Sequence, residues 1–294
     1  MRLLSFALFA SLVACGEATT SSTSAGPVAS TPVVVTAPVV ATAPVVATAP
    51  VVATAPVVVD TVASKVVGRY AMRVRLTTSQ TLPFLGKSKS TASLYKLATI
   101  AESEEGFTLT ESACEFAFEG GTAPLKIFLN PETVRSGPAM TTAIKIWDDK
   151  GVVRFDRDFA TVILGAQLKD ADLDALPTNK NDPRVIDADQ DGQAGVTAHA
   201  SGTIKLGFIK KNIEADIYFV QRSRDKFTGT LVEGGRLSGS VIDETEQSLL
   251  GSNNVLLTLG GNVPTVQEVE QSSVEFVRIS DTATCDTVKF KTVF

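Results

Sequence analysis

The sequence predicts an all-β domain, an antiparallel barrel with a few short helices, that follows a disordered N-terminal tether. Two observations carry this prediction. Beyond residue 66, hydrophobic residues recur at every second position in many short runs, as expected for strands that bury one face. Between residues 31 and 60, prolines recur every six residues, and this spacing prevents both helix and sheet from continuing.

The first residues have the composition of an export signal. Arg2 supplies a positive charge, and residues 3–13 are almost entirely apolar, a run shorter than the roughly 20 residues of a membrane-spanning helix. The run ends in Leu12-Val13-Ala14-Cys15, which resembles the lipobox of bacterial lipoproteins. This resemblance implies a signal peptide over residues 1–14, cleavage after Ala14 and lipid modification of Cys15.

A lipidated Cys15 implies that the membrane is a partner of the mature chain, because two or more acyl chains make anchoring stable. Gly16 follows the cysteine, whereas the inner-membrane retention signal of this family is usually Asp at that position. The resemblance therefore implies an outer-membrane lipoprotein of the bacterial cell envelope, which faces either the periplasm or the cell surface.

The predicted linker covers residues 15–65. It begins as a Ser/Thr-rich stretch and continues as repeats of Ala-Pro-Val-Val-Ala-Thr. Proline fixes φ and removes a backbone donor, so we expect an extended, semi-rigid spacer of about 3 Å per residue. Such a spacer would hold the folded domain, residues 66–294, away from the membrane surface.

The folded domain is predicted to be a succession of short strands. In the first strand, Tyr70, Met72 and Val74 alternate with charged or small residues. A hairpin is predicted where residues 144–147 meet residues 152–155 across a turn that ends in glycine. Further strands are predicted at residues 92–94, 98–100, 107–109, 114–118, 203–208, 213–221, 227–232, 236–242, 274–279 and 288–293, with a turn at 210–212 and short helices at 132–134, 169–176 and 244–250.

So many strands with one polar face form an antiparallel sheet that closes into a barrel or folds into a β-sandwich. We favour a barrel similar to that of lipocalins, with the sandwich as the alternative. With Cys15 assigned to lipid, Cys114 and Cys285 remain as a pair in an oxidising compartment, which predicts a disulfide between them. The alternative is two separately buried thiols. A bond over so long a span suits a closed barrel whose first and last strands are neighbours.

An acidic loop is predicted at residues 182–195. Its segment Asp187-Ala188-Asp189-Gln190-Asp191-Gly192 resembles the opening of EF-hand and thrombospondin-type calcium loops. Ca²⁺ takes six to eight oxygen ligands, and alternate side chains of a curling loop present them. The resemblance implies Asp187, Asp189, Asp191 and the Gln193 carbonyl as ligands of a structural Ca²⁺.

Ala198 stands where an EF-hand has its bidentate Glu, which excludes a true EF-hand. A looser calcium loop remains, and so does an exposed acidic turn without an ion.

Composition restricts the function. The net charge is −5 without a basic cluster, which argues against nucleic-acid binding. His199 is the only histidine and is expected at a solvated strand position, so zinc sites and Cys/His catalysis lack their side chains. We therefore expect a non-enzymatic domain that binds a protein partner or a small apolar ligand. The alternatives are an assembly lipoprotein with a solid core and, less favoured, a carboxylate-based hydrolase.

Overall fold

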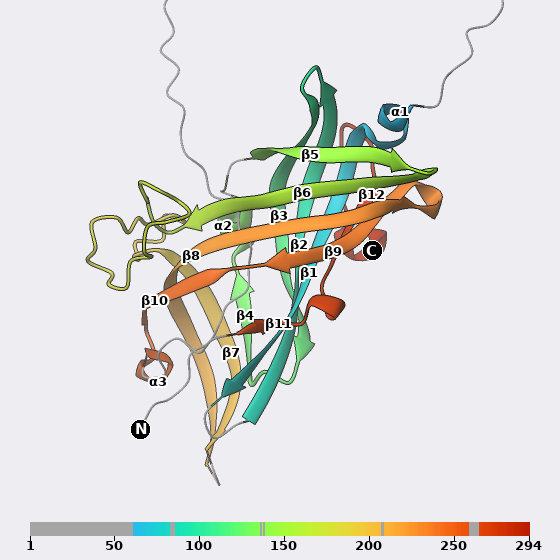
Figure 1. The fold of residues 1–294 in the computed structure, drawn as a ribbon. Helices are drawn as coiled ribbons and strands as arrows, with labels where there is room; N and C mark the ends of the chain where they lie inside the picture. Colours follow the sequence, from blue (N-terminus) through green and yellow to red (C-terminus); the bar gives the residue numbers. More distant parts are fainter. Residues whose placement is uncertain (1–60, 83–85, 136, 138, 207–208, 259–264) are drawn as a thin grey trace, which may run out of the picture. The chain divides into compact units, whose positions relative to one another are not determined.

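A computed structural model describes residues 61–294, apart from 83–85, 136, 138, 207–208 and 259–264 (Figure 1). The predicted signal peptide, Cys15 and the proline repeat lie outside the described residues. The all-β prediction is confirmed, because the described residues form one antiparallel sheet of 12 strands that curves into a ring.

Eight strands close the ring in the order of the chain. They are β1 (Gly68–Leu82), β2 (Gly86–Ser103), β3 (Gly106–Gly121), β5 (Met140–Asp149), β6 (Val152–Leu164), β8 (Ile209–Val232), β9 (Arg236–Asp243) and β12 (Ser273–Arg278). Each pairs antiparallel with the next, and β12 pairs with β1. The ring is thus an up-and-down barrel. The first and last strands are neighbours, as predicted.

The remaining strands extend one end of the ring. They are β4 (Leu125–Leu129), β7 (Val196–Leu206), β10 (Glu246–Ser252) and β11 (Val266–Gln267). Residues 209–219 of β8 pair with β7, and residues 221–230 pair with β6 inside the ring. In Figure 1, β6, β8 and β9 run across the view in front of β1–β3, which run steeply. The single strand β8 therefore belongs to both parts of the sheet.

The helices are short. They are α1 (Val62–Val66), α2 (Pro131–Arg135), α3 (Val255–Thr258), α4 (Phe290–Val293), and the 3₁₀ turns η1 (Glu233–Gly235) and η2 (Val269–Gln271). Helix α1 crosses the predicted boundary: residues 62–65 were assigned to the disordered linker, and Val66 to the folded domain. No described helix exceeds five residues, and none is thus long enough to cross a bilayer.

Two apolar clusters fill the inward face of the sheet. The first contains Phe155, Phe227 and Phe276, whose rings pack edge to face with centroids 5.8–6.3 Å apart. The second lies where β4, β7 and the first half of β8 pack together, and includes Ile127 and Ile217. The first cluster is built largely from alternating apolar positions of predicted strands. The second also contains Leu125, Ile127 and Leu129 of β4, a strand that was not predicted.

Four charged side chains lie between the two clusters. Lys96, Glu111 and Arg157 are at most 1% exposed, and Asp225 is 3% exposed. Lys96 Nζ lies 2.9 Å from Glu111 Oε1, and Arg157 NH2 lies 3.0 Å from Asp225 Oδ2 and 3.9 Å from Glu111 Oε2. Arg157 also lies over the ring of Phe227, at 4.1 Å from its centroid. Two positive and two negative groups thus balance inside the barrel.

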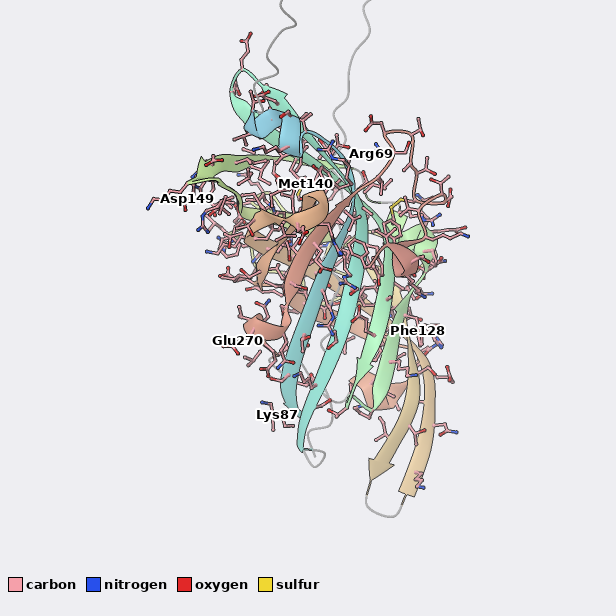
Figure 2. All side chains as sticks on the ribbon, turned by 90° about the vertical axis from the view of Figure 1, so that its right-hand side faces the viewer. Arg69, Lys87, Phe128, Met140, Asp149 and Glu270 are labelled. Carbon is pink, nitrogen blue, oxygen red and sulfur yellow. A yellow bond between two sulfur atoms is a disulfide. The ribbon has the colours of Figure 1, made fainter. Side chains whose placement is uncertain are left out.

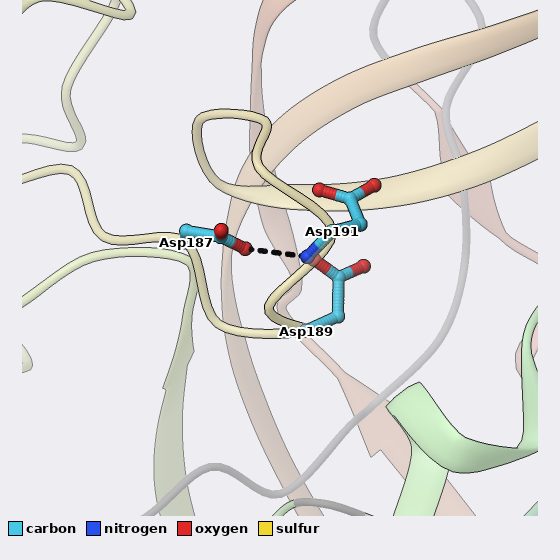
Figure 3. Close-up of side chains that lie close together, drawn as sticks. All are labelled: Asp187, Asp189 and Asp191. Atoms are coloured by element: carbon cyan, nitrogen blue, oxygen red, sulfur yellow. Dashed lines mark hydrogen bonds between the residues drawn. The ribbon is translucent and has the colours of Figure 1, made fainter.

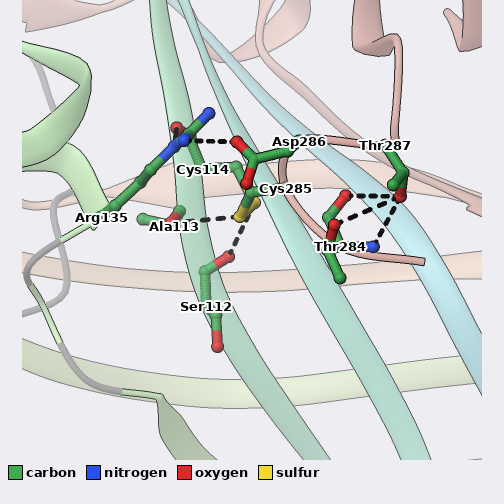
Figure 4. The surroundings of a disulfide bond; sticks show 8 residues. All are labelled: Ser112, Ala113, Cys114, Arg135, Thr284, Cys285, Asp286 and Thr287. Atoms are coloured by element: carbon green, nitrogen blue, oxygen red, sulfur yellow. Dashed lines mark hydrogen bonds and ion pairs between the residues drawn. A yellow bond between two sulfur atoms is a disulfide. The ribbon is translucent and has the colours of Figure 1, made fainter. Parts of the chain in front are cut away.

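The disulfide between Cys114 and Cys285 is present, with Cα atoms 5.3 Å apart (Figure 4). Tyr95 pairs with Glu115 and Lys96 with Ala113, so Cys114 is the extra residue of a β-bulge. It packs with Tyr95 and the C-terminal Phe290 in a third apolar cluster. The bond therefore fixes the C-terminal segment to β3, and pairing of β1 with β12 closes the ring.

Several local predictions were wrong. Residues 288–293 include α4 instead of a strand, so the disulfide does not tie a last strand to an early one. Residues 244–250 lie mostly in β10, and residues 169–176 form turns. Residues 210–212 belong to β8, because Leu206 pairs directly with Ile209. For residues 244–250, pairing with β8 outweighed the local helical pattern.

Candidate acidic pocket and metal centre

The acidic loop joins β6 to β7 and brings three carboxylates together (Figure 3). One ligand atom from each of Asp187, Asp189 and Asp191 lies within 4.8 Å of the others. Asp187 accepts hydrogen bonds from the backbone N–H groups of Asp191 (3.2 Å) and Gly192 (2.9 Å). Gly192 has a φ of +85°, which a glycine adopts without strain. The chain therefore curls around the Asp187 carboxylate, as the spacing predicts.

Asp189 is the least solvated of the three. Its Oδ2 accepts a hydrogen bond from Thr197 N at 2.9 Å, whereas its Oδ1 is buried without a partner among the described residues. Burial raises the pKa of Asp189, and the negative charges of Asp191 and Asp187 raise it further. A buried carboxylate oxygen beside two more carboxylates fits a hard cation such as Ca²⁺.

Two other residues of the loop make further contacts. The backbone N–H of Gln193, whose carbonyl is predicted as a ligand, donates to Asp191 Oδ1 at 2.8 Å, and Gln193 also lines a separate cavity of about 140 Å³ with Lys180 and Tyr218. Asp182 forms an ion pair with Arg184 at 2.8 Å, and this hydrogen-bonded partner lowers the pKa of Asp182 to about 2. The three aspartates alone form the cluster in the described part of the chain.

A cavity of about 320 Å³ adjoins the loop. Phe128 on β4, His199 on β7 and Asp216 on β8 are direct cross-strand neighbours that line it. Figure 2 shows Phe128 at the surface of the molecule. Asp189 and Asp191 complete the acidic wall, and the remaining lining residues are Leu129, Asn130, Thr133 and Thr197.

His199 lies between two carboxylates. Its Nδ1 is 3.0 Å from Asp216 Oδ1, and its Nε2 is 2.8 Å from Glu214 Oε2. These two hydrogen bonds raise the pKa of His199. The strand position is exposed, as predicted, but the sequence did not reveal the two partners. The alternation of Glu214 and Asp216 opposite His199 becomes informative only once the register of β7 and β8 is known.

The chain matches no protein-family model, and neither a curated protein nor a solved structure matches it. The fold and the site therefore define the class of protein: an all-β barrel with an acidic pocket on its outer surface. Chemically, the pocket offers hydrogen-bond acceptors and negative charge, together with one exposed aromatic ring.

Proposed function

We propose that this chain is a membrane-anchored, extracytoplasmic lipoprotein of the bacterial outer membrane whose non-enzymatic β domain binds a ligand or partner at the acidic pocket. In this proposal a structural Ca²⁺ occupies the Asp loop. The observation that carries the proposal is that Asp189 and Asp191 belong both to the carboxylate cluster and to the wall of the pocket. An ion in the loop would thus order one side of the binding site.

The packing of the barrel supports a site on its outer surface. Phe155, Phe227 and Phe276 fill one part of the interior, and the four buried charges lie beside them. A small apolar ligand of the kind expected from the sequence would need an apolar space inside. The packing of these side chains also favours the alternative of an assembly lipoprotein with a solid core, whose outer surface would make every contact.

Lipidation is tested by metabolic labelling with a clickable fatty acid in a bacterial host. We expect label on the mature chain and its recovery with outer-membrane fractions. Cys15→Ser should abolish both, whereas Ser21→Ala in the same linker should leave them unchanged. Secretion of an unlabelled wild-type chain would refute the anchor.

Calcium binding is tested separately, by titrating the chelated full chain with Ca²⁺ in a calorimeter. We expect one site, lost in Asp187→Asn. That variant removes a carboxylate of the cluster that does not line the pocket. An absence of binding heat, together with an unchanged Tm, would remove the ion from the proposal.

A carboxylate-based hydrolase is a second candidate, favoured by the proximity of Asp189 to two further carboxylates and by the burial that raises the pKa of Asp189. A panel of chromogenic esters and glycosides tests it. Turnover that disappears in Asp189→Asn would establish an enzyme, and the absence of turnover across the panel would support the binding role.

A further inference from the structure

We infer that the acidic pocket receives an organic cation, a primary ammonium or guanidinium group. The inference rests on the proposed function and names the chemistry of its ligand. It draws on the charge of the pocket, on its shape with the exposed Phe128 ring, and on its hydrogen-bonding capacity.

Charge is the first line of support. Asp189, Asp191 and Asp216 line the pocket, and no Lys or Arg does so among the described residues. The loop aspartates form no ion pair with a described basic residue, while Asp216 shares His199 with Glu214. The pocket and the adjoining residues therefore bring together five carboxylates (Asp187, Asp189, Asp191, Glu214 and Asp216) and one imidazole. If His199 is protonated and the loop holds Ca²⁺, these groups together still carry two excess negative charges.

A basic side chain lies in the next cross-strand row on this face. It is Lys126 on β4, opposite Ser201, which in turn pairs with Glu214. It is not one of the lining residues. A cationic ligand would therefore supply the positive charge that the described part of the chain does not place there.

The shape and the aromatic wall are independent of the carboxylates. A cavity of about 320 Å³ is at the lower end of the range for small-molecule sites. The Phe128 side chain is 47% exposed, and its ring centroid lies 6.5 Å from that of His199. The face of an aromatic ring attracts a cation within about 6 Å of its centroid. An exposed Phe beside acidic groups thus suits an alkylammonium or alkylguanidinium chain.

The polar atoms that line the pocket also favour a ligand that donates hydrogen bonds. Asp189 Oδ1 and Thr197 Oγ1 are buried, and neither has a hydrogen-bond partner among the described residues. Asp216 Oδ2 already accepts a hydrogen bond from Asn253 at 3.0 Å, which holds that carboxylate in place. An ammonium group has three donors and no acceptor, so it matches a wall that consists mainly of acceptors.

The experiment compares ligands of nearly equal size with the full mature chain. n-Butylammonium, n-butylguanidinium, n-butanol and butyrate are titrated by NMR, each with saturating Ca²⁺ and with chelator. We expect binding of the two cations alone. Acetyl-lysine-amide and spermidine form a further pair, which distinguishes a protein side chain from a free polyamine as the source of the cation. No binding of either cation at millimolar concentration, or equal binding of butanol, would overturn the inference.

Variants locate the site. Asp216→Asn should weaken butylammonium binding about tenfold, because one charge-assisted hydrogen bond is lost. Phe128→Leu keeps an apolar side chain without the aromatic ring, and should weaken it about threefold. Glu104→Gln, an exposed acid in the turn between β2 and β3, is the matched control. Unchanged affinity in Phe128→Leu and Asp216→Asn would overturn the assignment to this pocket.

The outcomes for Ca²⁺ and for the cation are separable. Asp187→Asn should abolish the calcium response while butylammonium still binds, because Asp187 does not line the pocket. If the wild-type chain shows no calcium response but still binds butylammonium, the structural ion is refuted and the cation assignment stands.

Discussion

Lys96 Nζ lies 2.9 Å from Glu111 Oε1 at the centre of the barrel, and solvent reaches neither side chain. The pair separates the two apolar clusters and connects to Arg157 and Asp225. Buried ions are stable only when their charges are balanced and their hydrogen bonds are formed. The network therefore makes the stability of the barrel sensitive to the loss of any one member.

The first expectation is that Glu111→Gln destabilises the chain by about 3–5 kcal/mol, because Lys96 and Arg157 would then share one carboxylate inside the protein. Urea denaturation measures this change. The matched variant Lys96→Met with Glu111→Leu removes both charges of the pair and should be less destabilising than the single substitution. If Glu111→Gln lowers the free energy of unfolding by less than about 1 kcal/mol, water must solvate the network of buried charges.

Calcium should raise the Tm of the wild-type chain, and EGTA should reverse the rise. In the chelated protein, Asp189→Asn should be more stable than wild type at neutral pH. The reason is that a carboxyl group with a raised pKa is destabilising in its charged form above that pKa. The same variant should lose the calcium response. An Asp189→Asn chain that is less stable without calcium would contradict the interpretation of Asp189 as a desolvated charge.

His199 should make stability depend on pH. Hydrogen bonds to Asp216 and Glu214 raise the folded-state pKa of His199 above 6.5. The stabilisation of the fold by protonated His199 is therefore fully present below pH 6.5, and it is lost as the pH rises through the folded-state pKa. The pKa of Glu214 is lowered from 4.5 mainly by Ser201 and also by His199, so its contribution is lost under acid conditions. Unfolding free energies of wild type and His199→Gln should differ more at about pH 6 than at about pH 9. Equal differences at both pH values would show that protonated His199 gains nothing from its two carboxylates.

Reduction of the disulfide should loosen the C-terminal segment before the barrel. Cys285 follows β12, and its partner Cys114 lies in a bulge on the outer face of β3. Hydrogen exchange under reducing conditions should therefore increase around α4, while the β1–β12 pairing keeps its protection. Cys114→Ala with Cys285→Ala should lower stability by about 3–5 kcal/mol. Simultaneous loss of protection in β1 would show that the bond holds the ring closed.

Much of the fold was predictable from periodicity. The alternation around Tyr70 and Val74 predicts β1, and the turn at Lys150-Gly151 predicts the β5–β6 hairpin, where Asp149 pairs with Val152. Both signals are local, since one face of a strand is buried and a glycine with positive φ closes the turn. They are sufficient to identify an antiparallel all-β domain, and they left the barrel and the β-sandwich as alternatives.

Buried charges and long-range neighbours were not predictable in this way. Lys96 and Arg157 belong to residue types that are usually exposed. The register of β2 with β3 places Lys96 beside Glu111, and the register of β6 with β8 places Arg157 beside Asp225. The carboxylate cluster was predicted because Asp187, Asp189 and Asp191 are close in sequence. The pocket was missed because Phe128 and Asp216 are distant in sequence and meet only through the register of three strands.

The length of β8 has a consequence for how the protein unfolds. Its 24 residues form hydrogen-bonded ladders with β6, β7, β9 and β10. The half of this strand with Ile217 packs in one apolar cluster, and the half with Phe227 packs in the other. We therefore expect the described residues to unfold as one cooperative unit, and two complementary fragments divided between Phe219 and Phe227 to be stable only after they reassociate.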